Sequence, residues 1–228
     1  FHLGQANFKC NGIHGEQNIV QAIAHSCNVY FYHIGLNLKE VLLQKWAKKF
    51  YLDSTSGIDL PYEQKGFIPS PAWKMKVFKT RWFPGDTVNF SIGQGFMRAT
   101  PLGAMLAMNV FATDGCLVKP FLLKQKDGQG VYQVKKVSLG LNPHYMGIIK
   151  KGLRKVVADS GGSAHYLEQL GLTISGKTGT AQASPQAHGW FVGFFPQIHP
   201  EYTICVFLEN CGSSWHSVKT AHDFLKPL

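Results

Sequence analysis

The sequence predicts an α/β fold of the α+β type, in which a central antiparallel sheet is covered by helices. Segments with helical periodicity dominate residues 1–160, whereas residues 171–228 hold three runs rich in β-branched and aromatic residues, followed by one helical segment. The length of 228 residues and the hydrophobic content of 45% suffice for the core of one domain. We therefore expect one domain with a mainly helical and loop part at 1–160 and a strand-rich part at 171–228.

The helical part is expected to begin with two helices. The first covers residues 19–34 and is interrupted near Ser26, and the second covers residues 38–50. Three large apolar residues of the second helix recur every fourth position and are expected to form one buried stripe, namely Leu42, Trp46 and Phe50. Residues 51–99 are rich in proline and glycine and are expected to form loops.

Two further helices are expected before the strands. Thr100 is an N-cap residue and Pro101 a first-turn residue, so together they open a helix that Gly115 ends. The next helix covers about 144–158, and a run of Ser, Gly and Gly stops it. These two helices are candidates for the layer that covers the sheet.

The strand-rich part is expected to contain three strands and a closing helix. The strands cover residues 174–182, 190–195 and 202–208, and prolines in the last connection indicate a hairpin. A short helix follows at 216–225. A strand, a hairpin and a helix that follow a helical block indicate an antiparallel sheet packed against helices.

Charge and cysteine content exclude several classes of protein. The net charge of +10 fits either an acidic partner or a solvated basic surface. The basic residues form separate groups without a zinc-finger, RNP or basic-zipper pattern, so no nucleic acid partner is expected. The five cysteines include no Cys-x-x-Cys pair, which excludes a dense disulfide framework. The sequence contains no run of 18 apolar residues, so it predicts no membrane-spanning helix.

The first strand, ISGKTGTAQ, has two interpretations on its composition. It is either an ordinary strand with a glycine bulge and a solvated lysine, or an edge strand beside a reaction centre. In the second interpretation Lys177 supplies a positive charge, Gly179 lets another backbone approach, and threonine hydroxyls bind a carboxylate. A free N–H at the strand edge would then stabilise an oxyanion.

A second motif, Ser26-Cys27-Asn28, favours the catalytic interpretation. Ser-x-Asn followed by Lys-Thr-Gly is the order seen in penicillin-recognising serine enzymes. The chain resembles the transpeptidase domain of class B penicillin-binding proteins over nearly its whole length, and most of all the elongation class often called penicillin-binding protein 2. The segments that carry this resemblance, besides GKTGTAQ, are GIDLP (57–61), GDTVNFSIGQG (85–95), ATPLGAMLAMNVFATDG (99–115) and HGWFVGFFP (188–196).

The resemblance implies a penicillin-binding transpeptidase fold that is N-terminally truncated, the chain being the C-terminal portion of one transpeptidase domain. It implies a peptidoglycan D,D-transpeptidase that cross-links stem peptides by acyl transfer and binds β-lactams when intact. The family's nucleophile lies in a Ser-x-x-Lys motif, and no serine of this chain has a lysine three positions on. We expect that motif before Phe1, so that the fragment alone is inactive.

The resemblance also implies residue roles. Ser26 would relay a proton between the missing nucleophile and the leaving amine with the help of Lys177, and Asn28 would hold the substrate amide and the nucleophile's lysine. The backbone N–H of Thr180 would be half of the oxyanion hole. The implied substrate-binding residues are Thr178, Gly179 and Thr180.

Catalysis of this kind requires no cofactor, but a structural zinc is a further hypothesis. Cys10, His14 and Cys27 are zinc-ligand types, and elongation-class relatives can carry ligands at matching positions. A fourth ligand would lie before Phe1 or be His2. Two buried thiols and a loop histidine are the alternative, and the sequence leaves both interpretations open.

The resemblance implies partners and a location as well. Peptidoglycan stem peptides and β-lactam antibiotics would bind the site, and a membrane glycan polymerase and elongation-complex proteins would be partners. The protein would lie at the periplasmic face of the bacterial inner membrane, anchored by an N-terminal helix absent from this chain. The alternatives are a β-lactam sensor or catalytically silent scaffold of the same fold, a D,D-carboxypeptidase, and a β-lactamase, for which no deacylating glutamate is evident.

Overall fold

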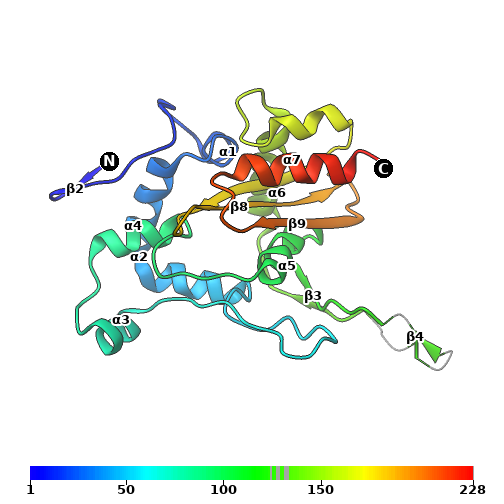
Figure 1. Ribbon diagram of the computed structural model, residues 1–228, viewed down its shortest axis with the longest axis horizontal. Coiled ribbons are helices and arrows are strands. Elements are labelled where there is room, and N and C mark those ends of the chain that lie inside the picture. The colour runs from blue at the N-terminus through cyan, green and yellow to red at the C-terminus, as the bar shows by residue number, and fades with distance from the viewer. Residues whose placement is uncertain (124, 127–128, 131–133, 228) are drawn as a thin grey trace.

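A three-stranded antiparallel sheet near the C-terminus organises the fold (Figure 1). In the computed structural model, which describes residues 1–123, 125–126, 129–130 and 134–227, the strand order is β7-β8-β9. The strands are β7 (Ser175–Ala181), β8 (His188–Phe195) and β9 (Tyr202–Leu208). The predicted antiparallel sheet and its closing hairpin are confirmed, and β7 is regular, with continuous pairing to β8 and no bulge.

Helices cover both faces of this sheet. Asn109 Nδ2 in α5 (Pro101–Ala112) donates a hydrogen bond of 3.0 Å to the hydroxyl of Thr203. The N–H of Ser214, the first residue of α7 (Ser214–Leu225), donates one of 3.1 Å to the hydroxyl of Thr180. Because side chains alternate along a strand and paired residues share a face, the register places these two threonines on opposite faces. The predicted α+β arrangement is therefore confirmed.

The main core lies between the sheet and the helices that cover it. It draws on α6 (Pro143–Ala158) and the 3₁₀ helix η1 (His165–Leu170) as well as on α5 and α7. Its fully buried apolar side chains include Val156, Leu167, Ile174, Phe191, Phe194 and Val218. The helix at 143–158 and the closing helix appear where the sequence predicts them, and Thr100 caps α5 through the N–H of Gly103.

The first helical zone breaks at Ser26, as predicted, but its second half differs from the prediction. Helix α1 (Ile19–Ala24) ends before Ser26, and α2 (Asn28–Lys49) runs on with one non-helical residue, Lys39, at φ +59°. The predicted buried stripe is wrong, since Leu42 and Trp46 are 40% and 44% exposed. The buried positions of α2 are instead Tyr32 and Gly35, which lie in its first half before the non-helical residue Lys39.

Residues 51–99 were predicted to form loops, but this segment also contains two helices. These are α3 (Pro71–Phe78) and α4 (Pro84–Ser91), each with a proline in its first turn. Proline interrupts a helix interior but suits the first turn, where its missing N–H is not needed. Ser70 caps α3, and Lys74 Nζ bonds Asp86 Oδ2 at 2.5 Å, which ties the two helices together.

Short strand pairs lie outside the main sheet. All are antiparallel: β1 (His2–Leu3) pairs with β2 (Ala6–Asn7), β3 (Cys116–Val118) with β6 (Lys136–Ser138), and β4 (Gln125–Lys126) with β5 (Gln129–Gly130).

Within the described residues, no helix combines the length and the apolar character that crossing a membrane requires.

A glycine on α6 sets how closely α1 packs. A Cβ added at Gly152 would lie 2.8 Å from Cδ1 and 2.9 Å from Cβ of Ile23. We predict that Gly152→Ala lowers the free energy of unfolding by about 1–3 kcal/mol, because α1 must shift. Gly147→Ala on the same helix is the matched control, since its Cβ would meet nothing within 4 Å, and it should stabilise by about 0.5–1 kcal/mol. Urea unfolding measures both; equal effects would contradict the packing argument.

Candidate active site

Ser26 and Lys177 meet at the edge of the sheet. Lys177 Nζ donates hydrogen bonds to Ser26 Oγ at 2.8 Å and to the carbonyl oxygen of Thr178 at 3.0 Å. The first bond joins the turn between α1 and α2 to strand β7. Two motifs that lie far apart in the sequence therefore belong to one site.

The turn that carries Ser26 is held in an unusual conformation. Ser26 has φ +54°, a left-handed conformation that residues other than glycine seldom adopt and that carries strain of about 1–3 kcal/mol. Two backbone bonds hold it, from the N–H of Ser26 to the carbonyl of Ile23 at 3.3 Å and from the N–H of Cys27 to the carbonyl of Ala22 at 2.9 Å. The turn ends α1 sharply and starts α2 at Asn28, with Ser26 facing β7.

A cleft of about 650 Å³ lies beside this contact. Its walls come from the N-terminal segment, the Ser26 turn, α2, the end of α4 and strand β7. All predicted catalytic and substrate-binding residues contribute to it, together with Phe8, Tyr32, Asn89 and Gln94. The predicted members are Ser26, Asn28, Lys177, Thr178, Gly179 and Thr180.

Strand β7 presents backbone groups to the cleft. Gln94 Nε2 donates to the carbonyl of Thr180 at 2.9 Å, and Gln94 Oε1 accepts from the N–H of Gln182 at 3.3 Å. In an antiparallel strand the N–H and C=O of one residue point to the same side. The N–H of Thr180 thus points to the edge that β8 does not occupy. Gly93 and Gly95, both at φ near +75°, shape the loop that presents Gln94.

Gln94 and Ser163 are site residues that sequence reasoning missed. Gln94 lies in the IGQG segment, which marked the resemblance but suggested no role, although its flanking glycines were a signal. Ser163 Oγ lies 2.6 Å from Thr178 Oγ1, and nothing in its local sequence indicates this contact. Gly179 has room for a Cβ on the side of Trp190, at 3.4 Å, so packing against β8 does not require a glycine there.

Asn28 faces the cleft but contacts the N-terminal segment. Its Nδ2 donates to the carbonyl of Lys9 at 3.3 Å, and its backbone N–H donates to Cys10 Sγ at 3.2 Å. Tyr32 on the same helix also donates to the carbonyl of Lys9, at 3.0 Å. The start of α2 therefore fixes the segment that forms one wall of the cleft.

Lys177 is unusually easy to deprotonate. Burial lowers its pKa to about 8, because the charged ammonium loses water. Its hydrogen-bond acceptors are a hydroxyl and a backbone carbonyl, and within the described residues no carboxylate forms an ion pair with it. Lys177 is therefore mostly charged at neutral pH but close enough to its pKa to exchange a proton.

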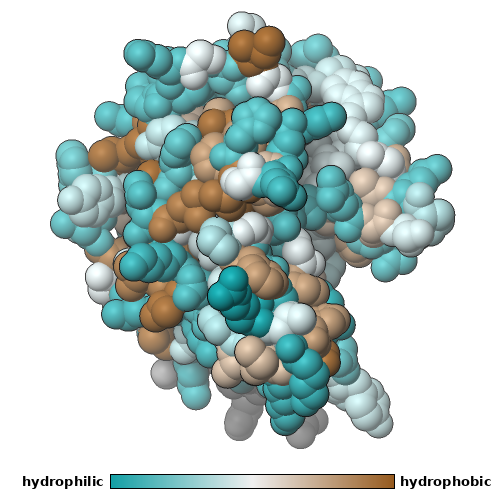
Figure 2. Space-filling model, turned by 90° about the vertical axis from the view of Figure 1, so that its left-hand side faces the viewer, coloured by the Kyte–Doolittle hydropathy of each residue, from teal (hydrophilic) through white to brown (hydrophobic). Residues whose placement is uncertain are grey.

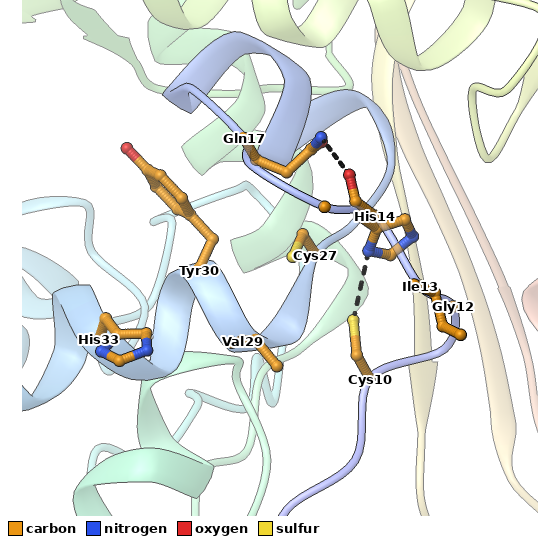
Figure 3. A pocket seen from close by; sticks show the side chains of 10 residues that line it. Cys10, Gly12, Ile13, His14, Gln17, Cys27, Val29, Tyr30 and His33 are labelled. Carbon is orange, nitrogen blue, oxygen red and sulfur yellow. Dashed lines mark hydrogen bonds between the residues drawn. The ribbon is translucent and has the colours of Figure 1, made fainter.

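The three predicted metal-ligating residues converge beside the Ser26 turn (Figure 3). The ligand atoms of Cys10, His14 and Cys27 lie within 4.8 Å of one another, and Cys10 Sγ is 3.5 Å from His14 Nδ1. Tetrahedral zinc bonds of about 2.3 Å to sulfur and about 2.0 Å to nitrogen place such atoms roughly 3.5 Å apart. In the described part of the chain this group has three members, and His2 is not one of them.

The two thiols differ in their environments. Burial raises the pKa of Cys27 above its ordinary value. Burial would also raise that of Cys10, but the backbone N–H groups of Gly12, Val29 and Asn28 outweigh it and lower the pKa. N–H groups aimed at Cys10 Sγ favour a thiolate there, which is the form that binds a metal.

Comparison with known proteins identifies this arrangement. The sequence matches the profile of the family described as penicillin binding protein transpeptidase domain over residues 4–226. The chain belongs to this family. It is 31% identical to the peptidoglycan D,D-transpeptidase MrdA of Acinetobacter baumannii over 233 residues, which covers 92% of this chain and 35% of the relative. The MrdA of Escherichia coli strain K12 is 30% identical over 222 residues, with coverages of 88% and 35%.

Solved structures agree with this assignment. A complex between the penicillin-binding protein PBP2 and MreC from Helicobacter pylori has a TM-score of 0.87 and 29% identity, covering 99% of this chain and 42% of that chain. Pseudomonas aeruginosa PBP2 in complex with WCK 5153 has a TM-score of 0.85 and 27% identity, with coverages of 99% and 51%. The resemblance to elongation-class penicillin-binding protein 2 is thus confirmed, and this transpeptidase-domain chain spans about a third of the length of its curated relatives.

The pKa of Lys177 predicts a pH dependence of stability. The folded state holds Lys177 with a pKa of about 8, below the ordinary lysine value of 10.5, so between these values the unfolded chain binds more protons. The free energy of unfolding should rise with pH across this window, by at most about 3 kcal/mol from this group.

Urea unfolding of the unaltered chain and of Lys177→Met at several pH values across the window measures this contribution. The difference between their slopes isolates Lys177 from other groups that titrate. Lys45→Met changes an exposed lysine of α2 and should keep the slope of the unaltered chain. Equal slopes for the unaltered chain and Lys177→Met would contradict the assigned pKa.

Proposed function

We propose that this chain supplies most of the acyl-transfer site of a peptidoglycan D,D-transpeptidase. The contact between Lys177 Nζ and Ser26 Oγ at the edge of β7 is the observation that carries the proposal. An exposed strand edge pairs with an extended peptide, and the cleft beside it offers a cation, several side-chain hydroxyls and a backbone N–H. The MrdA relatives, which are peptidoglycan D,D-transpeptidases, support the same reaction.

The nucleophile is proposed to come from a Ser-x-x-Lys segment outside this chain, because no such motif occurs in these residues. Its serine oxygen attacks the carbonyl carbon of the penultimate D-alanine, and the peptide C–N bond breaks. The proton of that serine reaches the departing D-alanine amine through Ser26 Oγ, with Lys177 lowering the free energy of the negative charge. The amine of a second stem peptide then attacks the ester carbonyl, the ester C–O bond breaks, and a proton from the amine returns to the serine oxygen, which leaves the cross-linking amide and the free serine.

Strand β7 is proposed to hold the acyl donor. The N–H of Thr180 donates to the oxyanion, and loss of one such donor typically costs about 3–4 kcal/mol of transition-state stabilisation. Thr178 and Thr180 hydroxyls bind the donor's terminal carboxylate, and Gly179 leaves the edge open for its backbone. Asn28 holds the donor amide and the lysine of the nucleophile motif, which requires its bond to Lys9 to be exchanged or shared.

We further propose that Cys10, His14 and Cys27 hold a structural zinc ion. The convergence of their ligand atoms and the backbone N–H groups around Cys10 Sγ support it. Zinc would contribute no step to the acyl transfer. It would fix the N-terminal segment against the turn that carries Ser26, since Cys27 follows Ser26 directly.

The proposed setting is the periplasmic face of the inner membrane, with an anchoring helix outside this chain. The proposed partners are a membrane glycan polymerase and proteins of the elongation complex. Solved relatives support this, since one is a complex of PBP2 with MreC and another is a peptidoglycan synthase complex that coordinates polymerization and crosslinking. The face that carries the N-terminal segment shows apolar side chains gathered near its centre (Figure 2).

Acylation by a β-lactam tests the proposed function. The full-length protein that carries this chain should be labelled stoichiometrically by a fluorescent penicillin, whereas the 228-residue chain alone should not, because it lacks the nucleophile. Lys177→Ala in the full-length protein should slow labelling at least about 100-fold without lowering the melting temperature.

The outcomes are distinguishable by intact-mass spectrometry and calorimetry. Labelling of the 228-residue chain would mean that the nucleophile lies within it. Labelling of the full-length protein without cross-linking of synthetic stem peptides would indicate a β-lactam sensor or a silent scaffold. Release of D-alanine without cross-links would indicate a D,D-carboxypeptidase.

The zinc proposal predicts about one zinc ion per chain by elemental analysis of the purified protein. Cys27→Ser should release it and lower the melting temperature, since the ion stabilises the folded state by binding it. Cys211→Ser is the matched control because Cys211 lies outside the cluster. Equal zinc content in both variants would rule out the proposed ligands.

A further inference from the structure

Ser163 joins the two halves of the site. Its backbone N–H donates to the carbonyl of Ala24 at 3.3 Å, two residues before Ser26. Its hydroxyl lies 2.6 Å from Thr178 Oγ1, next to Lys177 in the chain. One residue therefore contacts both the end of α1 and strand β7.

The turn before Ser163 fixes its place. A Cβ added at Gly162 would lie 2.4 Å from the carbonyl oxygen of Val156 and 2.6 Å from that of Lys155, so only glycine fits. The N–H of Gly162 donates to the carbonyl of Asp159 at 2.8 Å, and the N–H of Ala164 to that of Val156 at 2.9 Å. Ala164 itself is buried, at 1% exposure. The end of α6 thus holds Ser163 from both sides.

Thr178 lines the cleft, whereas Ser163 is absent from its wall in the described part of the chain. Any effect of Ser163 on a bound molecule therefore passes through the Thr178 hydroxyl. In a pair of hydroxyls only one proton lies between the oxygens. If Thr178 is to donate to an anion in the cleft, its own proton must point there, and Ser163 must supply the proton of the shared bond.

We propose that Ser163 is a positioning residue for the acyl donor: its hydroxyl donates to Thr178 Oγ1 and leaves the Thr178 proton free for the donor's terminal carboxylate. This inference rests on the proposed function of the site. The carboxylate is present before and during acylation, so the contact strengthens donor binding rather than the chemical step.

Saturation kinetics of acylation test the proposal in the full-length protein that carries this chain. The probes are benzylpenicillin and its carboxamide, which lacks the carboxylate. Ser163→Ala should raise the dissociation constant of the initial benzylpenicillin complex about three- to ten-fold, as expected for one hydrogen bond. The acylation rate constant should change less than about two-fold, and the values for the carboxamide should not change.

Ser163→Thr and Ser163→Val provide a pair of equal shape that differs in the hydroxyl. The threonine variant should behave as the unaltered protein and the valine variant as Ser163→Ala. A fall in the acylation rate constant, or an equal loss for both probes, would overturn the positioning role in favour of a structural one. Absence of acylation in the unaltered protein would instead defeat the proposed function. If the unaltered protein binds benzylpenicillin more tightly than its carboxamide and Ser163→Ala keeps this difference, the positioning role is wrong while the proposed function stands.

Discussion

A partly buried lysine whose contacts are dipoles, rather than a carboxylate in an ion pair, is the constraint on which the site depends. Among the described residues, the hydrogen-bond partners of Lys177 Nζ are the hydroxyl of Ser26 and the carbonyl of Thr178. Dipoles of this kind stabilise an ammonium less than water does, so burial lowers its pKa to about 8. A paired carboxylate would hold the proton firmly. The absence of such a pair among the described residues leaves the lysine able to share its proton with Ser26.

Strand β7 makes contacts on both faces of the sheet and at its free edge, because its side chains alternate between the faces. Lys177 and Gly179 point to the face covered by α5, and Thr178 and Thr180 point to the face covered by α7. The backbone groups between them point to the edge. A regular strand, without a bulge or a long loop, thus sets the Lys177 ammonium, two threonine hydroxyls and the free backbone N–H of Thr180 along one edge of the sheet.

The sequence predicted the sheet, most helices and the members of the cleft, since each depends on local periodicity or on a motif. The sequence-based prediction failed where contacts between distant parts of the chain determine the structure. Prolines that open α3 and α4 were interpreted as loop residues, and α2 buries residues before its break at Lys39 rather than Leu42 and Trp46 after it. Ser163 could not be found, because its role comes from the distance between its hydroxyl and that of Thr178, and no spacing along the chain encodes it.

The strained turn at Ser26 and the cysteine cluster are physically connected, because Cys27 of the cluster follows Ser26 directly. A left-handed serine persists only where its surroundings hold it. On one side the N–H of Ser163 holds the end of α1, and on the other the N–H of Asn28 donates to Cys10 Sγ. Cys27, between Ser26 and Asn28, packs into the same cluster and caps α2 without a side-chain bond. A metal bound there would therefore add its binding free energy to the conformation that aims Ser26 at Lys177, without touching the reacting atoms.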